Sequence, residues 1–75
     1  MGMINVVGSN GHTAVVWDVA NEEATAIAAA KFNELNRSGH ALFETQGGVA
    51  TAEGQQRVFN REAEEYLAVP AFGGG

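Results

Sequence analysis

Two histidines are the side chains of this 75-residue chain best suited to bind a metal ion. His12 and His40 each begin a predicted strand, so the two imidazoles would be neighbours if those strands paired. With the carboxylate of Asp18 or Glu44 they would form a three-ligand metal site. However, no HxH or HExxH spacing fixes the pair on one rigid element, and the chain has no cysteine. We therefore expect no metal and no other cofactor.

Catalytic chemistry has little support in the sequence. General acid–base catalysis needs two titratable groups held in a water-poor pocket. A two-layer domain of this length has little interior left for such a pocket once its core is filled. The GxSxG, GxxxxGK[ST] and GxGxxG motifs are absent from the sequence. We expect a protein that is not an enzyme and has no catalytic or cofactor-binding residues.

Charge limits the partners that this chain can bind. Nine acidic residues outweigh four basic ones, and the formal net charge is −5. Scattered cations this few cannot neutralise the roughly six or more phosphates that a DNA-binding protein contacts, and anionic lipid repels an acidic chain. No apolar run approaches the about 20 residues that span a bilayer. We expect a cytoplasmic protein, or a virion component if phage-encoded, that binds a protein partner or assembles with copies of itself rather than binding nucleic acid or membrane.

Two groups of residues are candidates for such protein contacts. The outer face of a predicted helix is rich in small side chains, which leave a smooth surface for a partner to cover: Ala26, Ala29 and Ala30. The acidic excess is greatest in a second group: Glu62, Glu64 and Glu65. This second group is either a solvated turn or a docking patch for a basic partner.

The elements that position these residues follow from the hydrophobic pattern. Short apolar, β-branched segments predict strands at residues 3–7, 12–17, 40–45, 56–59 and 66–69. Asn10-Gly11 lies between the first two and indicates a hairpin, because both residues tolerate positive φ. Residues 49–54 are weakly patterned and predict a loop with strand-like ends. Asn60 is placed to cap a single helical turn before the last strand.

Residues 22–38 predict the main helix. Asn21 is a good N-cap, Glu22 and Glu23 complement the positive end of the helix dipole, and Gly39 suits a left-handed C-cap. At 100° per residue, one apolar stripe faces the sheet. The stripe consists of Ala24, Ile27, Ala28, Phe32 and Leu35.

One helix covers only one face of a sheet, so the order of elements predicts a two-layer α+β fold. We expect a β-grasp-like roll over residues 1–70, a single domain whose last strand lies beside the first, followed by a glycine-rich tail at 71–75. The predicted core consists of Ile4, Val6, Val15, Trp17, Ile27, Phe32, Leu35, Leu42 or Phe43, Val58 and Leu67.

The segment 68–74, Ala-Val-Pro-Ala-Phe-Gly-Gly, resembles the ending of the molybdopterin-synthase small subunit and related ubiquitin-like sulfur carriers. In those proteins a last strand runs through proline into a terminal Gly-Gly. The resemblance implies a β-grasp fold and a C-terminus that is activated for sulfur transfer or conjugation, carried by Gly74 and Gly75. A flexible tail without such a role is the alternative.

A second resemblance covers more of the chain. Gly11-His12-Thr13, Trp17-Asp18, a helix with Phe32 and Leu35, and Ser38-Gly39-His40-Ala41 before Phe43 form a pattern similar to small uncharacterised proteins of bacteria and their phages. This resemblance implies an accessory structural role in a virion and carries over no catalytic residue. We therefore expect a small structural or interaction module, with a ubiquitin-like carrier as the alternative.

Overall fold

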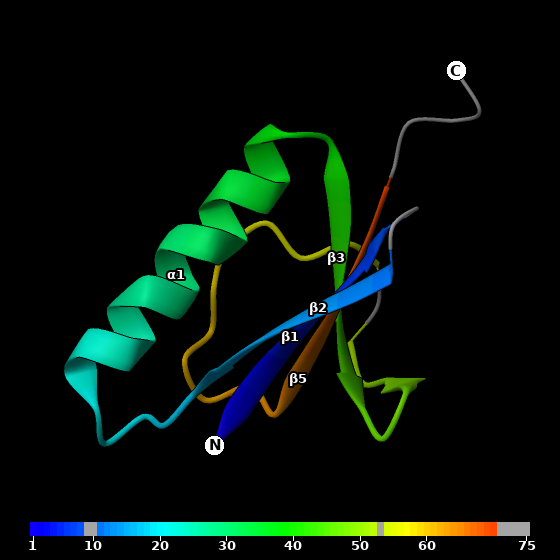
Figure 1. The fold of residues 1–75 in the computed structure, drawn as a ribbon. Coiled ribbons are helices and arrows are strands. Elements are labelled where there is room, and N and C mark those ends of the chain that lie inside the picture. The colour runs from blue at the N-terminus through cyan, green and yellow to red at the C-terminus, as the bar shows by residue number, and fades with distance from the viewer. Residues whose placement is uncertain (9–10, 53, 71–75) are drawn as a thin grey trace.

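The chain forms one helix packed on a five-stranded mixed sheet in the computed structural model (Figure 1). The structure describes residues 1–8, 11–52 and 54–70. The elements in chain order are β1 (Gly2–Gly8), β2 (Gly11–Trp17), α1 (Glu22–Arg37), β3 (His40–Gln46), β4 (Val49–Ala50) and β5 (Glu65–Pro70). This arrangement confirms the expected α+β class and is consistent with a small β-grasp-like fold. The predicted tail, with Gly74 and Gly75, lies outside the described residues.

The strands lie in the order β2-β1-β5-β3-β4 across the sheet. Strands β1 and β2 form the expected antiparallel hairpin, in a continuous register from Gly2↔Trp17 to Gly8↔Gly11. Strand β5 pairs parallel with β1 and antiparallel with β3. The last strand therefore lies beside the first, as predicted, and a parallel pair occupies the centre of the sheet.

Helix α1 begins and ends at the residues that the capping signals indicate. The Asn21 side chain accepts a hydrogen bond from the Ala24 N–H at 3.0 Å, which satisfies one of the unpaired donors of the first turn. Gly39 follows the helix with φ of 92°, a left-handed conformation that glycine adopts without a Cβ penalty.

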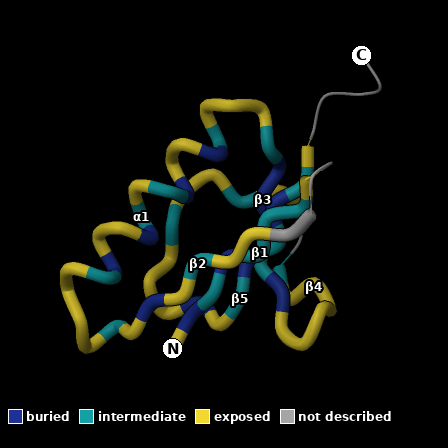
Figure 2. The backbone as a smooth tube through the Cα atoms, viewed as in Figure 1, coloured by how far each residue is buried: buried dark blue, intermediate teal, exposed yellow. Residues whose placement is uncertain are grey.

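The core lies between α1 and one face of the sheet. Its largest fully buried side chains are Trp17, Tyr66, Phe32, Ile4 and Leu42. Phe59 completes the aromatic part of this core, with its ring centroid 5.0 Å from that of Trp17 and 5.6 Å from that of Phe32. Figure 2 shows the buried positions gathered where the helix and the sheet face each other.

Two residues predicted to lie in the core are exposed. Ile27 is 61% exposed and Val58 is 79% exposed, so both assignments are wrong. The buried face of α1 is turned toward Thr25, whose hydroxyl donates to the Asp18 and Asn21 carbonyls at 3.1 and 2.9 Å. Because these bonds satisfy the hydroxyl, a polar residue takes the inward position and Ile27 turns to solvent.

The strand predicted at residues 56–59 is also wrong. The Gln56 N–H donates to the Leu42 carbonyl at 2.7 Å along the edge of β3. The chain then leaves the sheet, and Phe59 packs against the core. After it, Asn60 accepts from the Ala63 and Glu62 N–H groups, which makes a hydrogen-bonded turn in place of the expected helical one.

The other strand residues predicted to lie in the core are found on both faces of the sheet. Leu42 is fully buried and Phe43 is half-buried, which settles the alternative between them. Val6 and Val15 are partly buried against the core. Leu67 is half-buried, but its register opposite Phe43 places it on the face of the sheet away from the helix.

Candidate functional site

The face of the sheet away from α1 is the most distinctive surface of the molecule. Strand alternation puts Ile4, Tyr66 and Leu42 toward the helix, so the residues between them point to the other side. Most of these intervening residues are apolar: Met3, Val7, Ala14, Val16, Phe43, Leu67, Val69 and the buried Ala41. The polar residues of this face whose side chains the structure describes are Asn5, Thr45 and Glu65. We call this surface the open face, because no helix or strand of residues 1–8, 11–52 and 54–70 lies over it (Figure 1).

The open face crosses four strands, β2, β1, β5 and β3. Strands spaced about 4.8 Å apart, with roughly five residues each at about 3.3 Å, give an area of about 300 Å². Monomeric proteins rarely expose contiguous apolar patches of more than a few hundred Å², and patches of that size often mark interaction sites. Central parallel strands are usually covered on both faces. The open face is therefore a candidate contact surface.

One acidic residue, Glu65, lies at the corner of the open face. Its carboxylate accepts hydrogen bonds from the Thr45 hydroxyl at 2.6 Å, the Gly48 N–H at 3.1 Å and the Asn5 amide at 3.5 Å. The Thr45 and Gly48 bonds hold the pKa of Glu65 below its ordinary value, although burial opposes the shift. Glu65 was predicted as part of an acidic docking patch, and it also ties the turn between β3 and β4 to β5.

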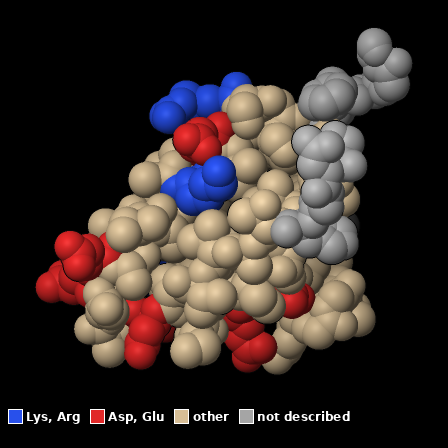
Figure 3. Space-filling model, in the orientation of Figure 1, with Lys and Arg blue, Asp and Glu red and all other residues tan. Residues whose placement is uncertain are grey.

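The other two acidic candidates lie elsewhere. Glu62 and Glu64 are exposed and line a shallow hollow of about 150 Å³ together with Glu44. Strand alternation separates them from the open face, since Glu44 pairs with Tyr66 on the helix side. Figure 3 shows acidic side chains along the lower edge of the view, one more between two basic groups at the upper left, and an uncharged surface between these regions.

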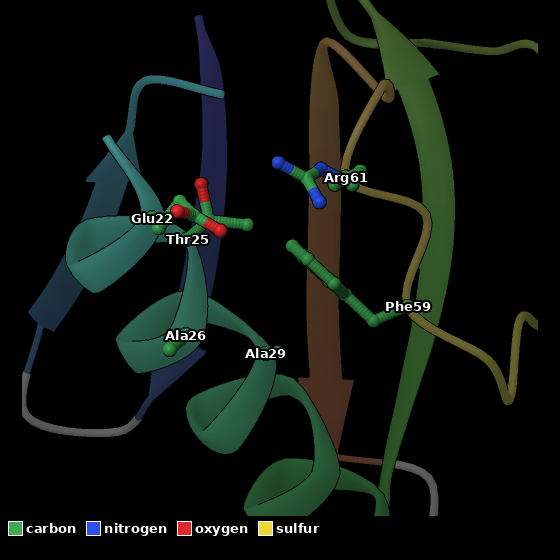
Figure 4. Close-up of a pocket in the computed structure, with 6 residues that line it drawn as sticks. All are labelled: Glu22, Thr25, Ala26, Ala29, Phe59 and Arg61. Atoms are coloured by element: carbon green, nitrogen blue, oxygen red, sulfur yellow. The ribbon is translucent and has the colours of Figure 1, made fainter. Parts of the chain in front are cut away.

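The alanine candidates border a groove between α1 and the loop that carries Phe59. Ala26 and Ala29 line this groove of about 300 Å³, whereas Ala30 is exposed and is not among the lining residues. Figure 4 shows the Phe59 and Arg61 side chains reaching from the loop toward the helix. The groove is suited to hold one apolar side chain of a ligand.

Opposite charges flank this groove. Glu22 lies on the helix side and Arg61 on the loop side (Figure 4). The Arg61 guanidinium donates one hydrogen bond to the Val19 carbonyl at 3.3 Å, and its other donors bind no acceptor among the described residues. In the described part of the chain no ion pair joins Glu22 to Arg61.

The two histidines are not on neighbouring strands. Two strands, β1 and β5, separate β2, which carries His12, from β3, which carries His40. At about 4.8 Å per strand this places the two backbones about 14 Å apart. No group of three metal-binding side chains was found among the described residues. The pairing on which a two-histidine site depended is therefore wrong.

None of the predictions from the sequence included the open face, although the sequence carries a signal for it. Residues 3–7 read Met-Ile-Asn-Val-Val, with apolar side chains on both faces of β1. Such a run is typical of a strand that is covered on both sides. With one helix available, only one of those sides is covered within the described chain.

No helix among the described residues has the length and hydrophobicity to cross a membrane. Searches against protein-family models, curated proteins and solved structures give no match to the chain. A function for this chain is therefore inferred from the geometry of its structure.

Proposed function

We propose that the protein is a small non-enzymatic interaction module that binds a partner protein on its open face. The observation that carries this proposal is the apolar surface over the central strands β1 and β5, on the side opposite the helix. Burying it against a partner removes apolar area from water, which is the main favourable contribution to protein association. An accessory role in assembling a larger particle, such as a virion, would use the same face.

Charge indicates the chemistry of the partner. The chain has a formal charge of −5, and the corner of the open face carries the ionised Glu65. A complementary surface has an apolar centre with a lysine or arginine placed against that corner. Because an area of about 300 Å² per partner is below that of a standard stable interface, we expect a transient complex.

Photo-crosslinking from the open face tests this proposal. A photoreactive residue at position 67, in the centre of the face, should crosslink one partner in the cells that produce the protein. The same residue at Val58 is the control, because Val58 is apolar and even more exposed than Leu67 but lies in the loop outside the face. Equal crosslinking from the two positions would contradict the proposal.

Binding by purified proteins provides the second measurement. Leu67→Lys should weaken the affinity for the crosslinked partner by about tenfold or more, because a charge replaces a buried apolar contact. Val58→Lys adds the same charge away from the face and should leave the affinity unchanged. Circular dichroism of both variants confirms that the fold is retained.

The strand order favours a second candidate function, a ubiquitin-like carrier. A last strand inserted beside the first, as in the order β2-β1-β5-β3-β4, agrees with the β-grasp fold that the resemblance of residues 68–74 implies. In such a carrier the Gly75 carboxylate reacts with ATP to form an acyl-adenylate and release pyrophosphate. Hydrosulfide then attacks the acyl carbon, releases AMP and leaves a thiocarboxylate.

Intact-mass spectrometry distinguishes this second function. Protein isolated from its producing cells should contain a species in which one terminal oxygen is replaced by sulfur, and deletion of Gly75 should abolish that species. If only the unmodified mass is found, the carrier function is wrong, whereas crosslinking from position 67 would still support the interaction module.

A further inference from the structure

Strand β2 is an edge of the sheet that lacks the usual protection against pairing. In the strand order only β1 lies beside it, and no other described strand pairs with its outer side. Its sequence, Gly-His-Thr-Ala-Val-Val-Trp, has no proline and no Asp, Glu, Lys or Arg. Its register with β1 is continuous over all seven residues, so no bulge twists the edge away. Natural sheets commonly protect an edge with one of these devices.

The hydrogen bonds of β1 show which backbone groups of β2 point outward. The N–H and C=O groups of one residue point to the same side of a strand, and the side alternates along the chain. The Met3 N–H donates to the Glu64 carbonyl at 3.1 Å, toward β5. Ile4 and Val6 therefore direct their backbone groups to their β2 partners, Val15 and Thr13.

It follows that the intervening residues of β2 point their backbone groups outward, where no described strand pairs with them. These residues are His12, Ala14 and Val16. The two side chains of this set that the structure describes are small or apolar: Ala14 is exposed and Val16 is 53% exposed. In the orientation of Figure 1, β2 is the strand nearest the viewer, and the middle of that view is uncharged in Figure 3.

We propose that β2 pairs antiparallel with β2 of a second copy of this chain, on a two-fold axis through Ala14. In this register Ala14 faces Ala14 of the other copy, and His12 faces Val16. Each of these pairs exchanges two backbone hydrogen bonds, because all three residues point their N–H and C=O groups outward. A two-fold interface of this kind is self-complementary.

Charge favours a second copy as the occupant of this edge. Two chains of net charge −5 repel each other at most surfaces. Strand β2 contains no acidic or basic residue, so the copies can approach there without bringing like charges together. The cross-strand contacts next to the axis join Thr13 to Val15, and β-branched pairs of this kind stabilise antiparallel sheets.

Sedimentation equilibrium over a range of concentrations, with matched variants, tests the pairing. The wild-type chain should form a dimer. Ala14→Pro removes an outward N–H from each copy but no hydrogen bond to β1, so it should raise the dimer dissociation constant by about tenfold or more. Leu67→Lys changes the open face and leaves β2 intact, so it should dimerise like the wild type.

Amide hydrogen exchange gives an independent readout. The Ala14 and Val16 amides should become protected as the concentration of the wild-type protein rises. The Thr13 and Val15 amides, which are bonded to β1, should be protected at every concentration. If Ala14→Pro does not fold, Ala14→Lys places two like charges opposite each other at the axis and should also prevent dimerisation.

Two results would overturn this pairing. One is a chain that remains monomeric at all concentrations, with rapid exchange of the Ala14 and Val16 amides throughout. The other is a dimer that Ala14→Pro leaves intact and Leu67→Lys abolishes, because the second copy would then lie on the open face. The second result would identify a copy of this chain as the partner in the proposed function.

Discussion

Trp17 links parts of the chain that are distant in sequence. Its ring contacts Phe59, its Nε1–H donates to the Arg61 carbonyl at 3.1 Å, and it is 1% exposed. The ring also covers Gly2 so closely that an added Cβ would overlap with it. The Trp17 side chain thus connects Gly2 of β1 to the loop between β4 and β5.

Removal of this ring should be the most damaging single change. Trp17→Ala leaves a large cavity and should lower the free energy of unfolding by about 3–5 kcal/mol, measured by urea denaturation. Trp17→Phe keeps most of the apolar volume and should cost less. A loss below about 1 kcal/mol for Trp17→Ala would contradict the buried position, since exposed substitutions have effects of that size.

Glu65 should make stability depend on acid pH. Its pKa in the folded protein is below the ordinary value of 4.5, because Thr45 and Gly48 donate hydrogen bonds to the carboxylate. The stabilisation is therefore complete above pH 4.5 and is lost as the pH falls through the lowered pKa.

Thermal denaturation between neutral and acid pH measures this effect. Glu65→Gln should remove the part of the acid destabilisation that Glu65 causes, whereas Glu64→Gln, a change of its exposed neighbour, should retain it. An unchanged pH profile for Glu65→Gln would show that these hydrogen bonds do not stabilise the folded state.

At the level of elements, helix α1 should tolerate change on the side that faces solvent. Ile27→Lys should alter the free energy of unfolding by no more than about 0.5 kcal/mol, as is usual for exposed positions. Leu35→Ala, on the buried side, should cost about 2–5 kcal/mol. Chemical denaturation of the two variants compares them, and a larger loss for Ile27→Lys would reverse the orientation of the helix.

The outcome for this helix shows what the sequence could and could not predict. Local signals at Asn21 and Gly39 determine its ends, and those predictions are confirmed. The side that turns inward depends on contacts between distant parts of the chain. Thr25 can be buried because its hydroxyl donates hydrogen bonds to the Asp18 and Asn21 carbonyls. The spacing of apolar residues in the sequence does not reveal such bonds.

The strands, like the helix, are predicted correctly where local signals determine them and wrongly, at residues 56–59, where distant contacts do. The Asn10-Gly11 signal correctly predicts the hairpin of β1 and β2, and the expected place of β5 beside β1 is confirmed. Residues 56–59 have the composition of a strand but lie outside the sheet, because the core takes up Phe59. Predicting the open face would have required the strand order. The alternation of side chains along a strand does not by itself show which of its two apolar faces the helix covers.

For the whole molecule, pairing through β2 should link stability to concentration. A two-fold axis perpendicular to the sheet places both helices on one side and joins the two open faces on the other, with a combined area of about 600 Å². Because association stabilises the folded state by mass action, the melting temperature of the wild-type chain should rise with protein concentration. Scanning calorimetry should show no such rise for Ala14→Pro.

The central position of β5 also affects how the protein is made. Ile4 and Tyr66 are register partners at opposite ends of the chain, so β1 leaves the ribosome long before the strand that completes its pairing. At about 5–20 residues per second, that interval is about 3–12 s. During it the hairpin of β1 and β2 has no neighbour from β5, and the hydrophobic core cannot close. The sheet and core of this small domain therefore form only after nearly all of it has been translated.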